Sequence, residues 1–490
     1  MHFARKDFDF IALNMNNTEA VHEVQMRGGR NFFSAFLEHT KCPPSSTDGI
    51  TCSPGDGKQG FFKLGQLRLF GRANGGSVSN EPSGNLSSID SLIRDGNGTV
   101  SLPFDPMEII ENLRFEKYAG AVSGQTSQIT DNKSLSRRLY YAIRPLLPVN
   151  VRKYLQRIAL QDWSKITFPA WPLDTTVEDF VDWLWVRIFQ VTGAEQIPFI
   201  WYWPKSFSSC AIMTHDVETG AGQDFCPTML KIEQEYGIKS AFELVPEVRY
   251  EISQEVMDAI RQAGSEVCVH GLNHDGRLFS SEELFRSRAK AINQYAEKWG
   301  ARGFRSPVMY RNLSWYDAFH FSYDMSVPNV AHLDPQRGGC CTVFPYFVGD
   351  ILELPLTATQ DYPLFNIIRS NPMEMWSKQM SAIVARHGLV SFIIHPDYII
   401  EPERQALYRQ LLQMLKKYGS EKNVWLALPR EVDTWWRERA AMSLECEDGD
   451  WSVRGKGADR AAVAYATLEN GKVKYVLPGE SAGTSASGCA

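Results

Sequence analysis

The chain has 490 residues, of which 43% are hydrophobic and 22% charged, and its formal net charge at pH 7 is −6. This composition is that of a globular protein with a large core, so it excludes a wholly disordered, collagen-like or coiled-coil chain. The slight acidic excess does not indicate a nucleic-acid-binding domain, and we expect no nucleic acid partner. At roughly 150 residues per domain, the length predicts about three domains.

No apolar run approaches the roughly 18 residues that a membrane-spanning helix needs. The first residues, MHFARKDFDFIALNMNN, lack the apolar core and the small-residue cleavage site of a secretory signal. The nine cysteines show no paired spacing of the zinc-ribbon kind. We therefore expect a cytoplasmic protein whose cysteines are free, buried thiols.

Residues 1–130 form a loop-rich N-terminal region whose fold the sequence does not indicate. Residues 41–101 are rich in Pro, Gly, Ser and Asn, which favours turns and mobile loops over packed structure. The apolar stretch FFKLGQLRLFG within this segment predicts a pair of strands.

Residues 131–204 are predicted to be a helical extension. The segment 134–161 carries six basic residues and no acidic one, and it predicts a helix pair broken at Pro145 and Pro148. Such a segment either docks on the protein with a solvated basic face or makes peripheral contact with an anionic membrane. Further on, Thr175 and Glu178 have the spacing of a capping box before the amphipathic stretch FVDWLWVRIFQ.

Residues 205–440 alternate between apolar strands and amphipathic helices, with helix starts predicted near Ser253, Ser280 and Pro372. Near-continuous apolar strands separated by helices predict a parallel sheet covered on both faces. Seven or eight such units fit a (β/α) barrel better than an open sheet. Residues 441–490 predict a short β-rich tail with a disordered end. The strand candidates are 209–214, 239–245, 265–270, 302–305, 321–327, 350–356, 389–395 and 424–428.

Polar residues gather at the ends of these strands, where the catalytic groups of a parallel α/β barrel collect. Two imidazoles and a carboxylate can hold a metal with open positions for water and substrate, and histidines four apart can aim at one point across a helical turn. A second carboxylate can accept a proton from water, an arginine can keep that carboxylate ionised, and a further histidine can protonate a leaving group. Each group alone also fits a cap, a charged turn or a core residue, so the coincidence of four clusters carries the interpretation. The clusters contain Asp216 and Glu218, His270 and His274, Arg305, and His395.

The order of these motifs resembles that of the polysaccharide deacetylases, also called NodB-homology or carbohydrate esterase family four proteins. THDVE is similar to the first family motif, HGLNH to the second, FRSP to the third and IIHPDY to the last, over about residues 205–435. The resemblance implies a distorted (β/α)7 barrel of the NodB type and a divalent metal, usually zinc. It also implies a hydrolase of non-peptide carbon–nitrogen bonds that removes acetyl groups from an N-acetylated glycan or glycan precursor.

The same resemblance implies a role for each residue. Asp216 corresponds to the general base, Arg305 to the residue that holds this base, and His395 to the general acid. The implied metal ligands are Glu218, His270 and His274.

Three positions depart from the family pattern: Val217 replaces a metal-binding Asp, Gly271 a Ser or Thr, and Val308 an aromatic residue. The family also has an Asp that supports the catalytic histidine, and both Asp324 and Asp361 are candidates for it.

Two alternatives to a sugar deacetylase stay open. One is a hydrolase of the same fold that acts on a non-sugar C–N bond, and the other is a catalytically inactive barrel that binds carbohydrate. His215 faces away from Asp216 by strand alternation, so we interpret it as a packing residue. The adjacent Cys340 and Cys341 also face apart and are interpreted as packing residues rather than as a metal or redox pair.

Overall fold

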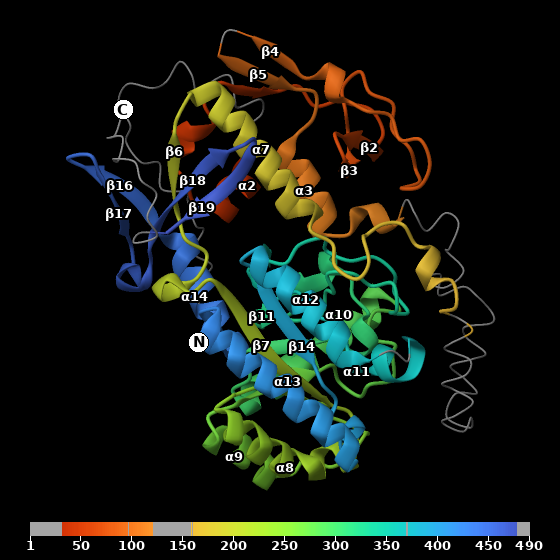
Figure 1. Ribbon diagram of the computed structural model, residues 1–490. Coiled ribbons are helices and arrows are strands. Elements are labelled where there is room, and N and C mark those ends of the chain that lie inside the picture. Colours follow the sequence, from red (N-terminus) through yellow and green to blue (C-terminus); the bar gives the residue numbers. More distant parts are fainter. Residues whose placement is uncertain (1–31, 97, 121–157, 159, 369–370, 478–490) are drawn as a thin grey trace, which may run out of the picture.

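The computed structural model describes residues 32–96, 98–120, 158, 160–368 and 371–477 (Figure 1). The helix pair predicted for 134–161 falls almost wholly outside these residues, as does the end of the tail, so both stay predictions. Among the described residues, no helix combines the length and the apolar character needed to cross a membrane.

The largest element is a curled sheet of nine strands with the order β12-β13-β11-β10-β9-β8-β7-β14, in which β15 pairs with the first half of β7. All neighbouring strands are parallel except β12 and β13. Each of the eight predicted strands is present, which confirms the predicted parallel α/β sheet. The strands are β7 Ser209–Val217, β8 Ala241–Leu244, β9 Glu266–His270, β10 Gly303–Arg305, β11 Tyr323–Asp324, β12 Tyr346–Val348, β13 Ile351–Glu353, β14 Leu389–Ile393 and β15 Val424–Ala427.

The ladder of this sheet is open between β13 and β14. The chain that follows β13 approaches β14 instead: the Ala358 N–H donates to Ser391 O at 3.1 Å, and Thr357 Oγ1 donates to Leu389 O at 2.8 Å. The sheet is therefore a curled half-barrel whose edges meet through a few hydrogen bonds. A closed barrel of seven units stays a prediction.

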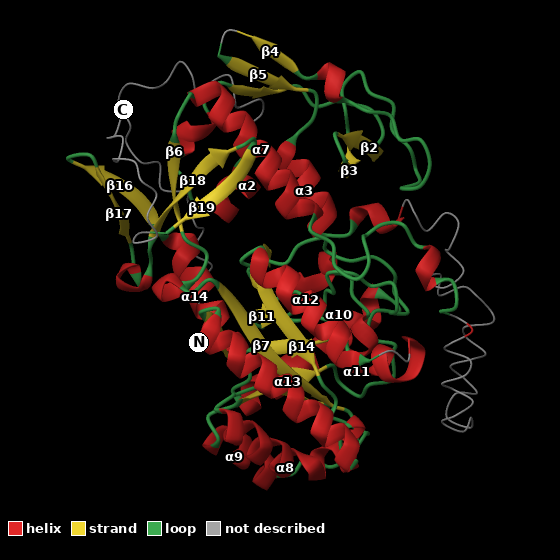
Figure 2. Cartoon of the chain, viewed as in Figure 1, coloured by secondary structure: helices red, strands yellow, loops and turns green. Residues whose placement is uncertain are grey.

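Helices pack against this sheet: α9 and α10 contact β9, α12 contacts β14 and α13 contacts β15. Figure 2 shows α12 and α13 beside the labelled strands β7, β11 and β14. Ser253 caps α9 by accepting from the Val256 N–H, and Pro372 opens α12, as predicted. Helix α10 starts one residue later than predicted, because Ser281 is its cap. The helices are α8 Gly220–Tyr236, α9 Gln254–Gln262, α10 Glu282–Trp299, α11 Asp361–Pro363, α12 Pro372–Ala385, α13 Pro402–Glu421 and α14 Pro429–Ala441.

The segment before the large sheet and the tail are joined by one small sheet, in which β18 pairs with both β6 and β19 (Figure 1). The hairpin β2–β3 confirms the predicted strand pair. The composition of residues 41–101 favours loops over packed structure, but this segment contributes fully buried side chains to the core, such as Ile50, Phe61 and Leu64. The elements are α2 Ser34–Thr40, β1 Ile50–Cys52, β2 Gly60–Leu64, β3 Leu67–Gly71, β4 Arg94–Gly96, β5 Thr99–Leu102, α3 Pro106–Arg114, α7 Thr176–Thr192, β6 Gln196–Ile200, β16 Ser443–Glu447, β17 Asp450–Arg454, β18 Val463–Glu469 and β19 Lys472–Val476.

The predicted capping box at the start of α7 is wrong. The Thr175 hydroxyl bonds the Asp179 carboxylate rather than a backbone N–H. Glu178 turns into the interior, where its Oε1 accepts from Thr342 Oγ1 and from the Val343 N–H. Tertiary partners have replaced the local cap, which places a carboxyl group in the core.

Seven of the cysteines within the described residues are free thiols, and all of these but the half-buried Cys52 are buried, as predicted. Cys446 differs from this prediction because it is disulfide-bonded. The division of the chain at 130, 204 and 440 stays a prediction, although β6 and β18 hydrogen-bond across two of the predicted boundaries.

Candidate active site

The predicted site residues lie together at the carboxyl ends of β7, β9, β10 and β14. Arg305, the last residue of β10, is in register with His270, the last residue of β9. Asp216 stands near the end of β7, and Glu218 follows that strand. Parallel strands end at one edge of a sheet, so residues far apart in the chain meet there.

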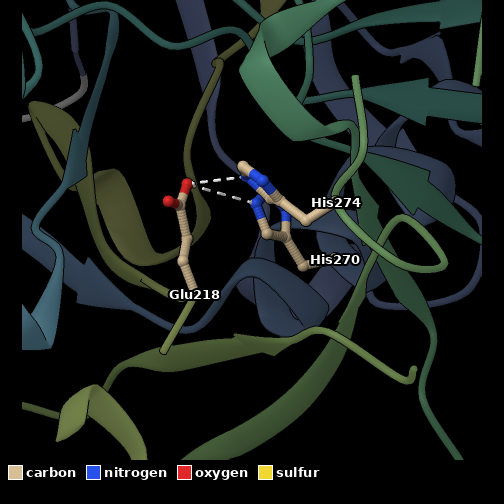
Figure 3. A group of neighbouring side chains, drawn as sticks. All are labelled: Glu218, His270 and His274. Carbon is tan, nitrogen blue, oxygen red and sulfur yellow. Dashed lines mark ion pairs between the residues drawn. The ribbon is translucent and has the colours of Figure 1, made fainter. Parts of the chain in front are cut away.

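Glu218, His270 and His274 form a compact group (Figure 3). Their ligand atoms all lie within 4.8 Å of one another. Glu218 Oε1 is 2.8 Å from His274 Nε2 and 3.7 Å from His270 Nε2. Both imidazoles are buried, whereas 19% of the Glu218 side chain is exposed. The group is therefore enclosed by protein and open to solvent mainly through Glu218.

The ring nitrogens of these histidines could serve as metal ligands. His270 Nδ1 lies 3.1 Å from Arg305 O, and since a carbonyl only accepts, Nδ1 carries the proton and Nε2 is left with a lone pair. His270 Nε2 and both ring nitrogens of His274 are buried and form no hydrogen bond of normal geometry, and the nearest polar atom to each Nε2 along this edge is Glu218 Oε1. Two such nitrogens and a carboxylate fit a divalent cation of the zinc type.

A loop, rather than the predicted helical turn, brings the two histidines together. His270 ends β9, and His274 has a positive φ of 53° in the loop that follows. Asp275 holds this loop through two hydrogen bonds from Arg288, at 2.8 and 2.7 Å.

Gly271 departs from the family motif for a steric reason. Its φ is +62°, and a Cβ at this position would lie 2.4 Å from Pro307 Cγ. Its N–H also donates to Arg305 O, which holds the backbone in place. Because a side chain has no room here, the Ser or Thr of the family pattern cannot be accommodated.

Asp216 is buried and held by Arg305. Its Oδ1 accepts from Arg305 Nη1 at 2.7 Å, and its Oδ2 is 3.8 Å from His270 Nε2. Burial opposes ionisation, but the Arg305 guanidinium outweighs it and lowers the pKa of Asp216. The carboxylate therefore stays charged inside the protein.

Glu243 is a neighbour that sequence reasoning missed. It lies on β8, fully buried, with Oε2 3.5 Å from Arg305 Nη1 and bonded to the His215 N–H. Burial raises the pKa of Glu243 well above its ordinary value. One guanidinium thus has two carboxyl groups beside it whose pKa values move in opposite directions. A single charged residue within the apolar stretch AFELV was the signal that could have revealed it.

His395 is held by Asp361, which decides between the two predicted candidates. Asp361 Oδ1 lies 2.7 Å from His395 Nδ1, and Asp361 Oδ2 accepts from the His395 backbone N–H at 2.8 Å. Burial alone would lower the pKa of His395, but the carboxylates of Asp361 and Glu218 raise it well above the ordinary value. Asp324 instead accepts from Ser326 and Tyr316, away from this histidine.

His215 lies outside the group, as predicted. It is fully buried, with Nε2 2.7 Å from Glu233 Oε1 and Nδ1 2.9 Å from Ile394 O. Both ring nitrogens have protein partners, so this histidine serves packing.

This chain is similar to known proteins only at the level of solved structures. No protein-family model and no curated protein matches the chain. A polysaccharide deacetylase from Mycobacterium smegmatis is 19% identical, with 51% of this chain and 98% of that chain covered and a TM-score of 0.40. Peptidoglycan deacetylase PdaC from Bacillus subtilis is 13% identical, with 48% and 94% covered and a TM-score of 0.31.

A CE4 family pseudoenzyme from Bacillus anthracis is 17% identical, with 46% of this chain and 65% of that chain covered and a TM-score of 0.31. The structures that resemble this chain are thus polysaccharide deacetylases and CE4 family members, the resemblance that the sequence motifs indicate. Sequence identities this low do not show that this chain has the activity of those proteins. Its chemistry depends on its own side chains.

Proposed function

We propose that this protein is a metal-dependent hydrolase that removes acetyl groups from the N-acetylated sugars of a glycan or glycan precursor. The observation that carries the proposal is the meeting of three groups at one sheet edge. These are a ligand set of metal type, a carboxylate kept ionised by an arginine, and an imidazole held by a carboxylate.

Glu218, His270 and His274 are the residues that would hold the divalent cation, and zinc fits two nitrogens and one oxygen. Such a cation supplies Lewis-acid chemistry, polarising a carbonyl and making water more acidic. Three protein ligands would leave room at such a cation for water and for the acetyl group of the substrate.

Asp216 acts as the general base. It accepts a proton from the water whose oxygen bonds to the acetyl carbonyl carbon, and Arg305 keeps it ionised for this task. His395 acts as the general acid and gives its proton to the amine nitrogen as the C–N bond breaks. Asp361 orients the imidazole and stabilises its charged form. The products are acetate and a free amino sugar.

Acetate release from N-acetylglucosamine oligomers, measured with zinc-loaded protein, tests this proposal. A parallel panel of non-sugar acetamides separates the sugar deacetylase from a hydrolase of other C–N bonds. We expect release from the sugar panel, and its loss in Asp361→Asn but not in Asp324→Asn. A fully zinc-loaded protein that is inert on both panels would instead be the inactive, carbohydrate-binding barrel.

A further inference from the structure

A separate cavity of about 290 Å³ lies at the amino end of β14. His387, two residues before this strand, lines the cavity, whereas His395 stands two residues after the strand. The cavity and the candidate active site thus flank the two ends of one strand. The cavity walls come from regions that are distant in sequence: α2, α7, the loops that carry Tyr202 and Phe344, the end of α12 with the residues that follow it, and β19.

The deep wall of the cavity contains buried polar groups with unused hydrogen-bonding capacity. His39 is 3% exposed and Glu178 is 5% exposed. His39 Nδ1 and Glu178 Oε2 are both buried without a hydrogen-bond partner. Leaving such a group unsatisfied destabilises the folded protein, so two of them on one cavity wall point to a ligand that bonds them.

These two groups are uncharged at neutral pH. Burial raises the pKa of Glu178 to about 8. Burial, together with the nearby Arg114 and Arg439, lowers the pKa of His39 well below its ordinary value. The deep wall therefore offers a carboxyl O–H and a neutral imidazole, which suit hydroxyl groups rather than a formal charge.

The charged groups at the mouth of the cavity are already paired. Asp182 Oδ2 accepts from Arg386 Nη1 at 2.9 Å, and Asp182 Oδ1 accepts from the Tyr475 hydroxyl at 2.9 Å. Lys474 forms an ion pair with Glu469. No lining charge is left in need of a charged ligand.

Aromatic rings form the rest of the deep wall. The rings of Tyr202 and Phe344 lie 4.6 Å apart, and that of His39 meets Phe344 edge-on at 4.8 Å. Tyr202 and Phe344 are 1% and 2% exposed. Flat apolar rings beside uncharged hydrogen-bonding groups match a molecule with a C–H face and a rim of hydroxyls.

We propose that this cavity binds an uncharged, polyhydroxylated ligand of about the size of one sugar ring. The site is distinct from the deacetylase site proposed above and does not depend on that proposal.

Ligand-observed saturation-transfer NMR on the full chain, with D-glucose and myo-inositol at millimolar concentration, tests this inference. Neither probe carries an acetyl group to be hydrolysed. Ala385→Trp blocks the cavity from the end of α12, and Ala382→Trp, three residues earlier and outside the lining, is the matched control. We expect transfer to the wild type and to Ala382→Trp, and at least a tenfold loss in Ala385→Trp, with acetate release equal in all three.

If Ala385→Trp does not fold, Val473→Trp on β19 blocks the same cavity from the other side. Absence of transfer to the wild type, or equal transfer in the blocked and control variants, overturns the proposal. Tighter binding of gluconate or glucosamine than of glucose overturns the assignment of an uncharged ligand.

Discussion

The two ends of β14 hold buried polar groups in opposite electrostatic states. At the carboxyl end, Asp216 and His395 are buried but charged, because Arg305 and Asp361 face them. At the amino end, Glu178 has only neutral partners, and burial removes its charge at neutral pH. Burial therefore does not set the protonation state of a group by itself; an opposite charge within hydrogen-bond distance decides it.

The largest expected loss of activity comes from removing a histidine of the candidate metal group at the carboxyl end of the sheet. His270→Ala or His274→Ala should lower metal stoichiometry and abolish acetate release. The stabilisation given by the bound ion should also be lost, about 2.7 kcal/mol when the metal is at 100 times its Kd. Metal analysis and thermal unfolding measure both, with His320→Ala, an exposed histidine outside the group, as the control. Full metal content in both alanine variants would exclude these ligands.

The next largest loss of turnover is expected when Asp216 is replaced by Asn, which removes the charge of the side chain and keeps its shape. Asp216→Asn should retain the metal but lose about 10²–10⁴-fold in turnover, the usual contribution of a general base. Asp324→Asn, whose carboxylate bonds Tyr316 and Ser326 rather than Asp216 or His395, should retain most activity. Wild-type turnover in Asp216→Asn would show that the ion pair with Arg305 is structural rather than catalytic.

His395→Ala should lower the reaction rate by an amount that depends on the leaving group of the substrate. An amine leaves only after it is protonated, whereas an activated ester needs no proton on departure. The loss of rate should therefore be large on an N-acetyl sugar and small on an activated acetate ester. Equal losses on the two substrates would remove His395 from the role of general acid.

Gly271→Ala tests the steric origin of the motif departure. Gly271 and Gly300 share a φ of +62°, but a Cβ at Gly300 meets nothing within 4 Å. Both substitutions carry the strain of a left-handed residue, about 1–2 kcal/mol, and only Gly271→Ala adds the clash with Pro307. Denaturant unfolding should show the larger loss in Gly271→Ala, together with weaker metal binding. Equal losses of stability in the two variants would mean that Pro307 shifts to accommodate the added methyl group at little cost.

The smallest effect on turnover is expected from Glu178→Gln, at the other end of β14. The pKa of Glu178 rises from 4.5 to about 8 on folding, so the folded state holds its proton more tightly. Its contribution to stability is complete below about pH 4.5 and is lost as the pH rises towards 8, by at most about 1.4 kcal/mol per pH unit. Glu178→Gln should flatten this dependence in thermal unfolding from pH 5 to 8 and leave acetate release unchanged. An unchanged slope would mean that Glu178 is ionised in the folded protein.

Sequence alone determined the strands of the sheet and most of the candidate site. Apolar runs such as SCAIMT and LVSFII can be read locally, because a strand buried on both faces needs apolar residues at every position. Asp216 and His395 stand directly beyond such runs, so their common edge follows from parallel pairing. The metal role of Glu218 came from the resemblance to a family rather than from periodicity.

Only the tertiary structure decided which groups face each other across the fold. It selected Asp361 over Asp324 as the partner of His395, placed Glu243 beside Arg305, and turned Glu178 from a helix cap into a cavity wall. Each of these contacts joins residues at least 34 positions apart in the chain. Local patterns report only which residues are apolar or polar, and the partner of a buried charge depends on packing that no short window of sequence contains.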